Sequence, residues 1–469
     1  MTRNGGGSKL AAGGTYAAIW LTAAALFFVI RGFGEELQVP GGAPVGAPVG
    51  VVESGPNALL HILLALAGVV ALGRLLARVC RLFGQPAVIG EVIAGILLGP
   101  SLLGRLAPGV ADYILPPFVA PTLGIVSQIG VVLYMFMVGL DLDLDAVRKR
   151  AHSTVLISHS SIVTPFVLGS VLALWLFPRV ATPGVPFTSF ALFMGIATSI
   201  TAFPVLARIL TDRGITRTEL GRIALTCAAV DDVTAWCLLA FVVGVAQDSL
   251  RSAAIVGLLT AVFVAVMFLA VRPLVARLMA RIGGAVGRDA IALVLLGVLV
   301  SSLTTEAIGI HAIFGAFLLG AIIPSDSTLA RTLVAKFEDL VTILLLPAFF
   351  AFTGMRTRIS LVATVEDWIM VALIILVATA GKFGGTVAAA RATGMAWRQA
   401  AGLGALMNTR GLMELIVLNI GLDLQVISPT LFTMMVLMAL ITTIATTPVL
   451  NALGTVSMRQ ADLSRSVRL

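Results

Sequence analysis

The stretch LTCAAVDDVTAWCLLAFVV, residues 225–243, is the most informative segment for the fold class of this chain. It belongs to a longer apolar segment, Leu220–Val245, whose only acidic residues, Asp231 and Asp232, fall about halfway along it. A helix needs about 17 to 25 mostly apolar residues to cross a bilayer. The segment is long enough, so it predicts a membrane-spanning helix that carries two adjacent carboxylates far from both membrane surfaces.

Further hydrophobic segments lie on both sides of this one. The chain is 59% hydrophobic and 12% charged, with a mean hydropathy of +1.06, whereas a soluble domain is about 25% charged. These values exclude a soluble globular enzyme and predict an all-α polytopic membrane protein. The segments expected to span are Tyr16–Ile30, Ala58–Val79, Val88–Leu103, Leu123–Leu140, Thr154–Phe177, Phe190–Leu210, Leu220–Val245, Ala253–Val271, Ala290–Leu303, Ile308–Ile323, Leu340–Phe352, Trp368–Ala390, Ala400–Leu422 and Leu431–Leu453.

The segments divide the chain into three parts. Residues 1–57 hold a cytoplasmic N-terminus, an extra helix at Tyr16–Ile30 and an external linker rich in Gly and Pro. The extra helix is followed by no small-x-small cleavage site, so we expect it to be retained rather than removed as a signal peptide. Residues 58–455 form the transmembrane domain with thirteen helices, and residues 456–469 form a short cytoplasmic tail.

The distribution of basic residues sets the expected orientation. The net charge of +8 could indicate a nucleic-acid partner. When the N-terminus is placed in the cytoplasm and the segments alternate in direction, however, most Lys and Arg residues fall on the cytoplasmic side, as the positive-inside rule requires. This predicts a cell-membrane protein, in the inner or plasma membrane, with both termini cytoplasmic and no nucleic-acid partner. The external basic residues are Arg31, Arg105, Arg179, Arg251, Arg356 and Arg358.

Once the basic residues near the cytoplasmic ends of the spans are assigned to that side, six charged residues remain inside the spans. Each is a candidate for function because a charge at the bilayer centre costs about 2.5–3.5 kcal/mol. Asp231 and Asp232 repel each other in a low dielectric, so they should titrate as one coupled unit that binds protons or a small hard cation through oxygen. A purely structural pairing would explain one aspartate through Lys382 and leave the other without an assigned partner. The six are Glu91, Asp231, Asp232, Lys382, Arg410 and Glu414.

The other charges fit supporting roles. Lys382 lies more than a helical turn from either end of its segment, which favours a salt bridge to Asp231 over snorkelling to the membrane surface. Arg410 and Glu414 are four residues apart and could pair with each other or with Glu91. For these last three residues, we expect the structural role of locking helices together.

Two of the predicted helices are interrupted in mid-span. Pro204 removes a backbone donor from Phe190–Leu210, and the hydroxyls of Thr198, Ser199 and Thr201 cluster there. Ala400–Leu422 has its own polar break at Asn408, Thr409 and Gly411. The two segments are seven helices apart and therefore run in opposite directions, which is the geometry of inverted repeats around a transporter's ion site. A simple proline kink would explain the first break alone. The expected helix-break residues are Pro204 and Gly411, and the expected ligands beside the aspartates are Thr198, Ser199 and Thr201, with Asn408 in a supporting role.

Five stretches together resemble the monovalent cation/proton antiporter superfamily, and within it the second branch, which holds plant cation/proton exchangers and bacterial potassium and sodium antiporters. They are VIGEVIAGILLGPSLLG (88–104), MFMVGLDLD (135–143), TSITAFPVLARIL (198–210), the Asp231-Asp232 segment and NTRGLMELIVLNIGL (408–422). The resemblance implies a thirteen-helix core, two crossing broken helices, a homodimer and an elevator-like motion. It also implies that Asp232 is the main ion-binding carboxylate and that Asp231 pairs with Lys382, a combination similar to that of the electrogenic members.

The chain departs from two groups of relatives. No strand followed by a Gly-x-Gly-x-x-Gly helix comes after the last segment, as it does in glutathione-gated potassium efflux systems, and the long C-terminal domain of the plant exchangers is missing. The resemblance therefore does not extend to gating by a cytosolic nucleotide.

The leading hypothesis is a secondary active transporter, not an enzyme, that exchanges K⁺ or Na⁺ for protons by competition at Asp231 and Asp232. The alternative is a cation channel or facilitator that uses the same carboxylates. An anion symporter on a similar scaffold would need more cationic side chains at the helix breaks. A redox role would need a haem-binding pattern of histidines, which the four histidines do not show. We expect no cofactor, and no metal other than a monovalent cation at the two aspartates. The expected partners are protons, Na⁺ or K⁺, membrane lipid and a second copy of the chain. Carboxylate, carbonyl and hydroxyl oxygens serve both cations, so the sequence leaves their identity and the stoichiometry open.

Overall fold

The computed structural model describes residues 5–39, 57–141, 151–216, 218–246, 250–282 and 287–454. Over these residues the chain is helical, with no strand. The main helices are α1 (Gly5–Gly34), α2 (Ala58–Leu82), α3 (Ala87–Leu98), α4 (Leu103–Leu106), α5 (Pro108–Ile114), α6 (Val119–Asp141), α8 (Ala151–Val180), α9 (Phe187–Ser199), α10 (Phe203–Asp212), α11 (Glu219–Ala246), α12 (Leu250–Val266), α13 (Arg272–Ile282), α14 (Arg288–Ile308), α15 (Ala312–Ile322), α16 (Thr328–Leu340), α17 (Leu346–Arg356), α18 (Val365–Ala392), α19 (Trp397–Met407), α20 (Leu412–Asp423) and α21 (Pro429–Ala452).

The prediction of an all-helical protein with many membrane spans is confirmed. Within the described residues, ten helices are long and apolar enough to cross a bilayer, and the pair α19 and α20, bent by 41°, makes an eleventh. Two shorter apolar helices, Ala18–Gly34 and Ala312–Ile322, coincide with further predicted spans. The count of thirteen core helices and the inverted repeat stay predictions. The predicted linker, residues 40–56, and the predicted tail, residues 456–469, lie outside the described residues.

Pro204 is not in a helix interior, which corrects the prediction made for it. The helix is already broken before it, because α9 ends at Ser199, Ile200 and Ala202 are extended, and Pro204 is the second residue of α10. Proline is tolerated in the first turn of a helix, where no intrahelical donor is needed. The residue therefore permits a new helix to start and does not kink an existing one.

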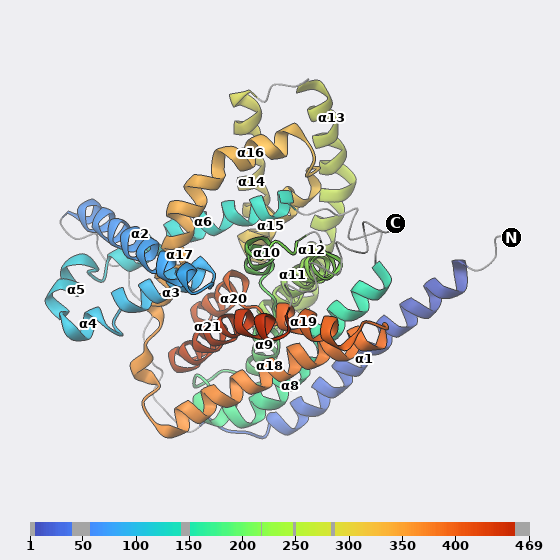
Figure 1. The fold of residues 1–469 in the computed structure, drawn as a ribbon, viewed down its shortest axis with the longest axis horizontal. Helices are drawn as coiled ribbons and strands as arrows, with labels where there is room; N and C mark the ends of the chain where they lie inside the picture. The colour runs from blue at the N-terminus through green and yellow to red at the C-terminus, as the bar shows by residue number, and fades with distance from the viewer. Residues whose placement is uncertain are drawn as a thin grey trace.

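Helix contacts separate two bundles, which Figure 1 shows side by side. The crossing bundle consists of α8 to α11 and α18 to α21, and its most extensive contact joins α18 to α8. The flanking bundle consists of α2, α3, α6 and α14 to α17. Helix α1 runs along the outside of the crossing bundle, against α8 and α9 (Figure 1).

Local sequence fixes α18, the helix that carries Lys382. It begins with a capping box in which Thr364 accepts from the Asp367 amide at 3.1 Å and Asp367 accepts from the Thr364 amide at 2.9 Å. Two glycines, one turn apart in its carboxyl-terminal half, bring it against α8: a Cβ on Gly381 would lie 2.6 Å from the Pro165 Cα, and one on Gly385 would lie 2.7 Å from Thr164 Oγ1. This close approach puts the buried Lys382 inside the crossing bundle rather than at a membrane surface.

Candidate functional site

The two helix breaks meet at the centre of the crossing bundle. The first runs from Ile200 to Ala202, between α9 and α10, and the second from Asn408 to Gly411, between α19 and α20. The Ala202 amide donates to the Thr409 carbonyl at 3.0 Å. Non-helical backbone at membrane depth is tolerated where it is buried in protein or lines a cavity. Here the breaks are buried, and they satisfy part of each other's backbone hydrogen bonding.

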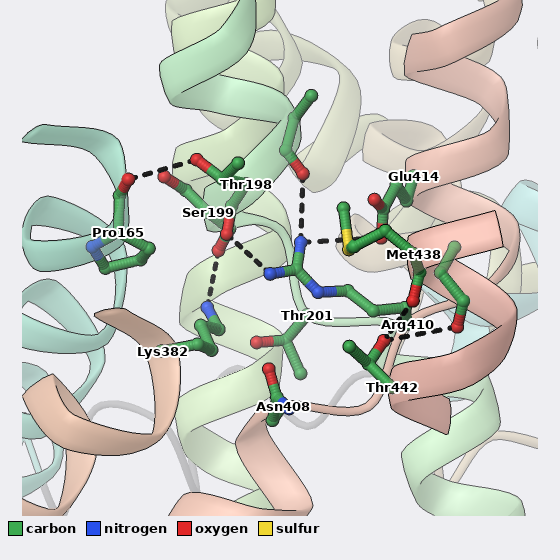
Figure 2. A network of polar contacts seen from close by, with 12 residues as sticks. Pro165, Thr198, Ser199, Thr201, Lys382, Asn408, Arg410, Glu414, Met438 and Thr442 are labelled. Carbon is green, nitrogen blue, oxygen red and sulfur yellow. Dashed lines mark hydrogen bonds and ion pairs between the residues drawn. The ribbon is translucent and has the colours of Figure 1, made fainter. Parts of the chain in front are cut away.

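Two cations hold the carboxyl-terminal end of α9. Arg410 donates to the carbonyls of Ala197 at 2.9 Å and Thr198 at 2.6 Å, and Lys382 Nζ lies 2.5 Å from the Ser199 carbonyl. Figure 2 shows both side chains pointing at this helix end. A helix carries a partial negative charge at its carboxyl end, so cations there are stabilising. The carbonyls that the break frees at residues 197–199 are thus occupied by the protein's own cations.

Asp231 is fully partnered. Its Oδ2 lies 2.8 Å from Lys382 Nζ in an ion pair with both side chains buried, and Thr201 Oγ1 donates to the same oxygen at 2.9 Å. From α8, Ser158 donates to Oδ1 at 2.5 Å and Ser161 donates to Oδ2 at 3.0 Å. A buried charge is tolerated when it is paired and its lone pairs accept hydrogen bonds. Asp231 meets both conditions.

Asp232 has the opposite environment. Its side chain is 1% exposed, and among the described residues neither carboxylate oxygen has a hydrogen-bond partner. The Phe203 amide, at the start of α10, approaches it without reaching hydrogen-bond geometry. A buried carboxylate without a partner is costly. Binding of a proton or a cation would therefore stabilise this group.

The hydroxyls of the first break divide into two sets. Thr198 Oγ1 lies 2.9 to 3.1 Å from the carbonyls of Met194, Pro165 and Gly195, and Ser199 Oγ donates to the carbonyls of Gly195 and Ile162. Only Thr201 turns its hydroxyl to an aspartate. Thr198 and Ser199 therefore tie α9 to itself and to α8 through their side chains.

The second break places Arg410 and Glu414 together. Arg410 Nη1 lies 3.4 Å from Glu414 Oε2, both side chains being fully buried, and the Arg410 backbone exchanges hydrogen bonds with the Thr443 hydroxyl of α21 at 2.8 and 3.0 Å. Asn408 is 7% exposed, and its Oδ1 has no partner in the part of the chain that the structure describes, while its Nδ2 lies 3.4 Å from Thr379 Oγ1.

Glu91 lies apart from this group. It is on α3 of the flanking bundle, and the cations that act on it are Arg74 and Arg81 of α2. No ion pair joins it to Arg410 among the described residues, where the partner of Arg410 is Glu414. The sequence left open whether Arg410 and Glu414 pair with each other or with Glu91. The structure shows the pair of Arg410 with Glu414.

Sequence reasoning missed Ser158 and Ser161, which donate to Asp231 from α8. The two serines are three residues apart and so share one helix face. Serines inside membrane helices commonly hydrogen-bond across helices, so their spacing in a predicted span was a usable indication. It did not reveal which helix they face.

Comparisons with known proteins agree with this architecture. The family described as sodium/hydrogen exchanger, transmembrane, matches residues 64–452. The Na⁺/H⁺ antiporter NhaS4 of Synechocystis is 44% identical over 396 residues, which cover 84% of this chain and 97% of that protein. Cation/H⁺ antiporter 19 of Arabidopsis thaliana is 41% identical over 84% of this chain, and K⁺/H⁺ antiporter 1 of Saccharomyces cerevisiae is 33% identical over 78%.

The length of these relatives differs. The matched region is 49% of the Arabidopsis protein and 43% of the yeast protein, so the chain spans about half the length of these two. Among solved structures, the sodium proton antiporter MjNhaP1 of Methanocaldococcus jannaschii superposes with a TM-score of 0.62, over 85% of this chain and 98% of that one. At 15% identity, this likeness shows a shared fold.

Proposed function

Because the chain belongs to the transmembrane sodium/hydrogen exchanger family, we propose that it exchanges a monovalent cation, K⁺ or Na⁺, for protons by competition at Asp231 and Asp232. One observation carries the mechanism. Two neighbouring carboxylates are equally buried, but Asp231 has four side-chain partners and Asp232 has none among the described residues.

The two aspartates have different roles in this proposal. Asp232 is the exchange site, since a proton or a cation supplies the partner that its oxygens lack. Asp231 is held by Lys382 and by the hydroxyls of Ser158, Ser161 and Thr201, and it keeps a second negative charge beside the site. One carboxylate cannot hold a proton and a cation at the same oxygens, so occupancy by one excludes the other. Exchange follows from this exclusion and needs no ATP.

Supporting oxygens lie on both breaks. On the first break, Thr201 donates to Asp231. The second break carries two buried oxygens without partners among the described residues, Asn408 Oδ1 and Thr409 Oγ1. Monovalent cations bind oxygen, so these atoms are the additional ligands that we propose. Thr198 and Ser199 hold the shape of the break. Relatives named for Na⁺/H⁺, K⁺/H⁺ and cation/H⁺ exchange support both K⁺ and Na⁺ as candidates.

In the membrane, we propose a multi-pass protein with cytoplasmic termini that works as a homodimer in the inner or plasma membrane. The crossing bundle carries the aspartates, and the flanking bundle is the frame against which it moves. The separation of helix contacts into these two bundles supports this division.

Purified protein in proteoliposomes tests the proposal. With the membrane potential clamped, adding Na⁺, K⁺ or Li⁺ in turn to acid-loaded vesicles should release protons for at least one cation, and Asp232→Asn should abolish the release. Current without a coupled pH change would identify a channel and overturn exchange. Full activity of the Asp232→Asn variant would overturn the assignment of the site and leave the antiport itself standing.

A further inference from the structure

A groove on the outer face of the crossing bundle is lined by no residue of the two helix breaks. It has a volume of about 460 Å³ and runs between α1 and the helices α8, α9 and α11. The apolar wall includes Trp20 and Phe27 of α1, Phe166 of α8, Leu192 of α9 and Phe241 of α11. Helix α1 precedes the region matched by the family, residues 64–452. Neither the family nor the proposed exchange site accounts for the groove.

The geometry points to a bound phospholipid with an ethanolamine headgroup, one acyl chain in the apolar part of the groove and the headgroup at its polar mouth. The mouth is formed by Arg31 and Glu35 at the end of α1 and by Thr188 at the start of α9.

The length of the groove matches the thickness of one leaflet of the bilayer. Its lining on α1 runs from Trp20 to Glu35, which is about 22 Å at a rise of 1.5 Å per residue. Half of a bilayer with its headgroups measures about 20–22 Å. The volume falls in the range of about 300–1,000 Å³ typical of small-molecule and cofactor sites. An extended chain with a headgroup therefore fills the groove from end to end.

The charges at the mouth are complementary to a zwitterion. Arg31 Nε lies 2.6 Å from Glu35 Oε1, with the side chains 40% and 51% exposed, and Thr188 Oγ1 lies 3.4 Å from the same oxygen. Guanidinium groups bind phosphate through several N–H donors, and a carboxylate binds a primary ammonium. An exposed ion pair is held weakly, so the two side chains can turn from each other to a phosphate and an amine that lie one ethylene apart.

The membrane is the source of the occupant. An apolar cavity excludes water, and the wall of this groove belongs to helices of a membrane protein. A site at this position also borders the end of α9 next to the first helix break, since Phe166 follows Pro165, whose carbonyl lies 3.0 Å from Thr198 Oγ1.

Native mass spectrometry of protein released from vesicles of phosphatidylethanolamine and phosphatidylglycerol tests the site. We expect one phosphatidylethanolamine per protomer, reduced at least about tenfold by Ala24→Trp, which fills the groove. The matched control is Leu21→Trp on the same helix, because Leu21 is 70% exposed and does not line the groove. Glu35→Gln should remove the preference for ethanolamine over glycerol headgroups. Equal retention in the two tryptophan variants, no retained lipid, or equal retention of both lipids by the wild type would overturn the proposal.

A second measurement follows the entry of the acyl chain into the groove directly. Phosphatidylethanolamine with brominated acyl chains should quench the fluorescence of Trp20 saturably when it is added to detergent-solubilised protein. The Trp20→Phe variant supplies the background from the other tryptophans. Equal quenching in the wild type and in the Trp20→Phe variant would show that the acyl chain does not enter the groove, and it would overturn the proposal.

Discussion

The backbone amide of Ala202 and the backbone carbonyl of Thr409 are joined by a hydrogen bond of 3.0 Å, although 207 positions separate them in the sequence. This bond links the two helix breaks directly. A shift of one break therefore strains the other, so the half-helices around the aspartates are expected to move as one unit.

Gly411 is expected to tolerate no side chain, because a Cβ there would lie 2.6 Å from Val205 Cγ2 of α10. Gly411→Ala should lower the free energy of unfolding by about 1–3 kcal/mol, as overpacking does in a dense core. Thermal unfolding in detergent measures this. The matched control is Gly384→Ala, since a Cβ on Gly384 meets no atom within 4 Å and alanine favours a helix. An equal loss in both variants would contradict the prediction.

The two aspartates should differ in their effect on stability. Asp231→Asn leaves Lys382 buried without its counter-charge and should cost about 3–5 kcal/mol. Asp232→Asn removes a carboxylate that has no hydrogen-bond partner among the described residues, so it should be neutral or stabilising. Chemical or thermal unfolding of both variants, side by side, checks the contrast. If the two variants were equally destabilised, the difference in partners would not be the determining factor.

Arg410→Lys should fail although it keeps the positive charge. Arginine reaches the carbonyls of Ala197 and Thr198 and the Glu414 carboxylate at once, and a lysine ammonium lacks this planar fork. Each hydrogen bond lost to a charged group costs about 1.5–3 kcal/mol. We expect a lower unfolding temperature and weaker exchange. Arg105→Lys, at an exposed position, is the control that should leave both unchanged.

Arg356 links the two bundles at one end of the molecule. From α17 of the flanking bundle it lies 2.5 Å from Asp423 Oδ1 and donates to Asn419 Oδ1 at 2.8 Å, both on α20 of the crossing bundle. If the bundles slide during transport, a covalent link here should stop exchange. A short bifunctional thiol reagent applied to Arg356→Cys with Asp423→Cys, after replacement of the native cysteines, should block it reversibly.

The control for this cross-link lies within one bundle. Ser101 Oγ donates to the Thr357 carbonyl at 2.8 Å, so the two residues are also neighbours. Cross-linking Ser101→Cys to Thr357→Cys should leave exchange intact. Undiminished exchange after cross-linking positions 356 and 423 would show that this contact persists throughout the transport cycle.

Competition also fixes the direction of the pH dependence. A proton that occupies the exchange site must leave before a cation binds, so the apparent KM for the cation should rise as pH falls, by up to about tenfold per pH unit for each competing proton, by mass action. Initial rates of exchange at several cation concentrations and pH values measure this. A KM that does not change with pH would exclude competition at a common site.

The sequence predicted an all-helical membrane protein and the residues that the structure gathers in the candidate site, for identifiable physical reasons. Long apolar segments and charges inside them are local properties, and they led to Asp231, Asp232, Lys382 and Arg410. The break was assigned to Pro204 because proline disrupts a helix interior, whereas the chain uses the extended residues Ile200 to Ala202 and then starts a helix at Phe203.

What the sequence left open depends on contacts between distant segments. Thr198 and Ser199 are predicted from sequence as ligands beside the aspartates, but their carbonyls accept from Arg410 and Lys382, which lie more than 180 positions away. Helical spacing does not indicate that Ser158 and Ser161 face Asp231, because that depends on how α8 and α11 rotate against each other. Glu91 could have paired with Arg410 on charge alone, but in the structure Arg410 pairs with Glu414.

The charged side chains gathered at the crossed breaks are Lys382, Arg410, Asp231, Asp232 and Glu414. Fully ionised, they carry one more negative than positive charge, and the side chains are essentially shielded from water. Displacing a net charge through a bilayer is expensive and also couples to the membrane potential, at about 2.3 kcal/mol per charge for each 100 mV. A single bound proton or a single bound monovalent cation makes the assembly electrically neutral. In the proposed exchange, the vacant site is therefore the state with a strong electrostatic reason not to cross, and this would suppress leak in both directions.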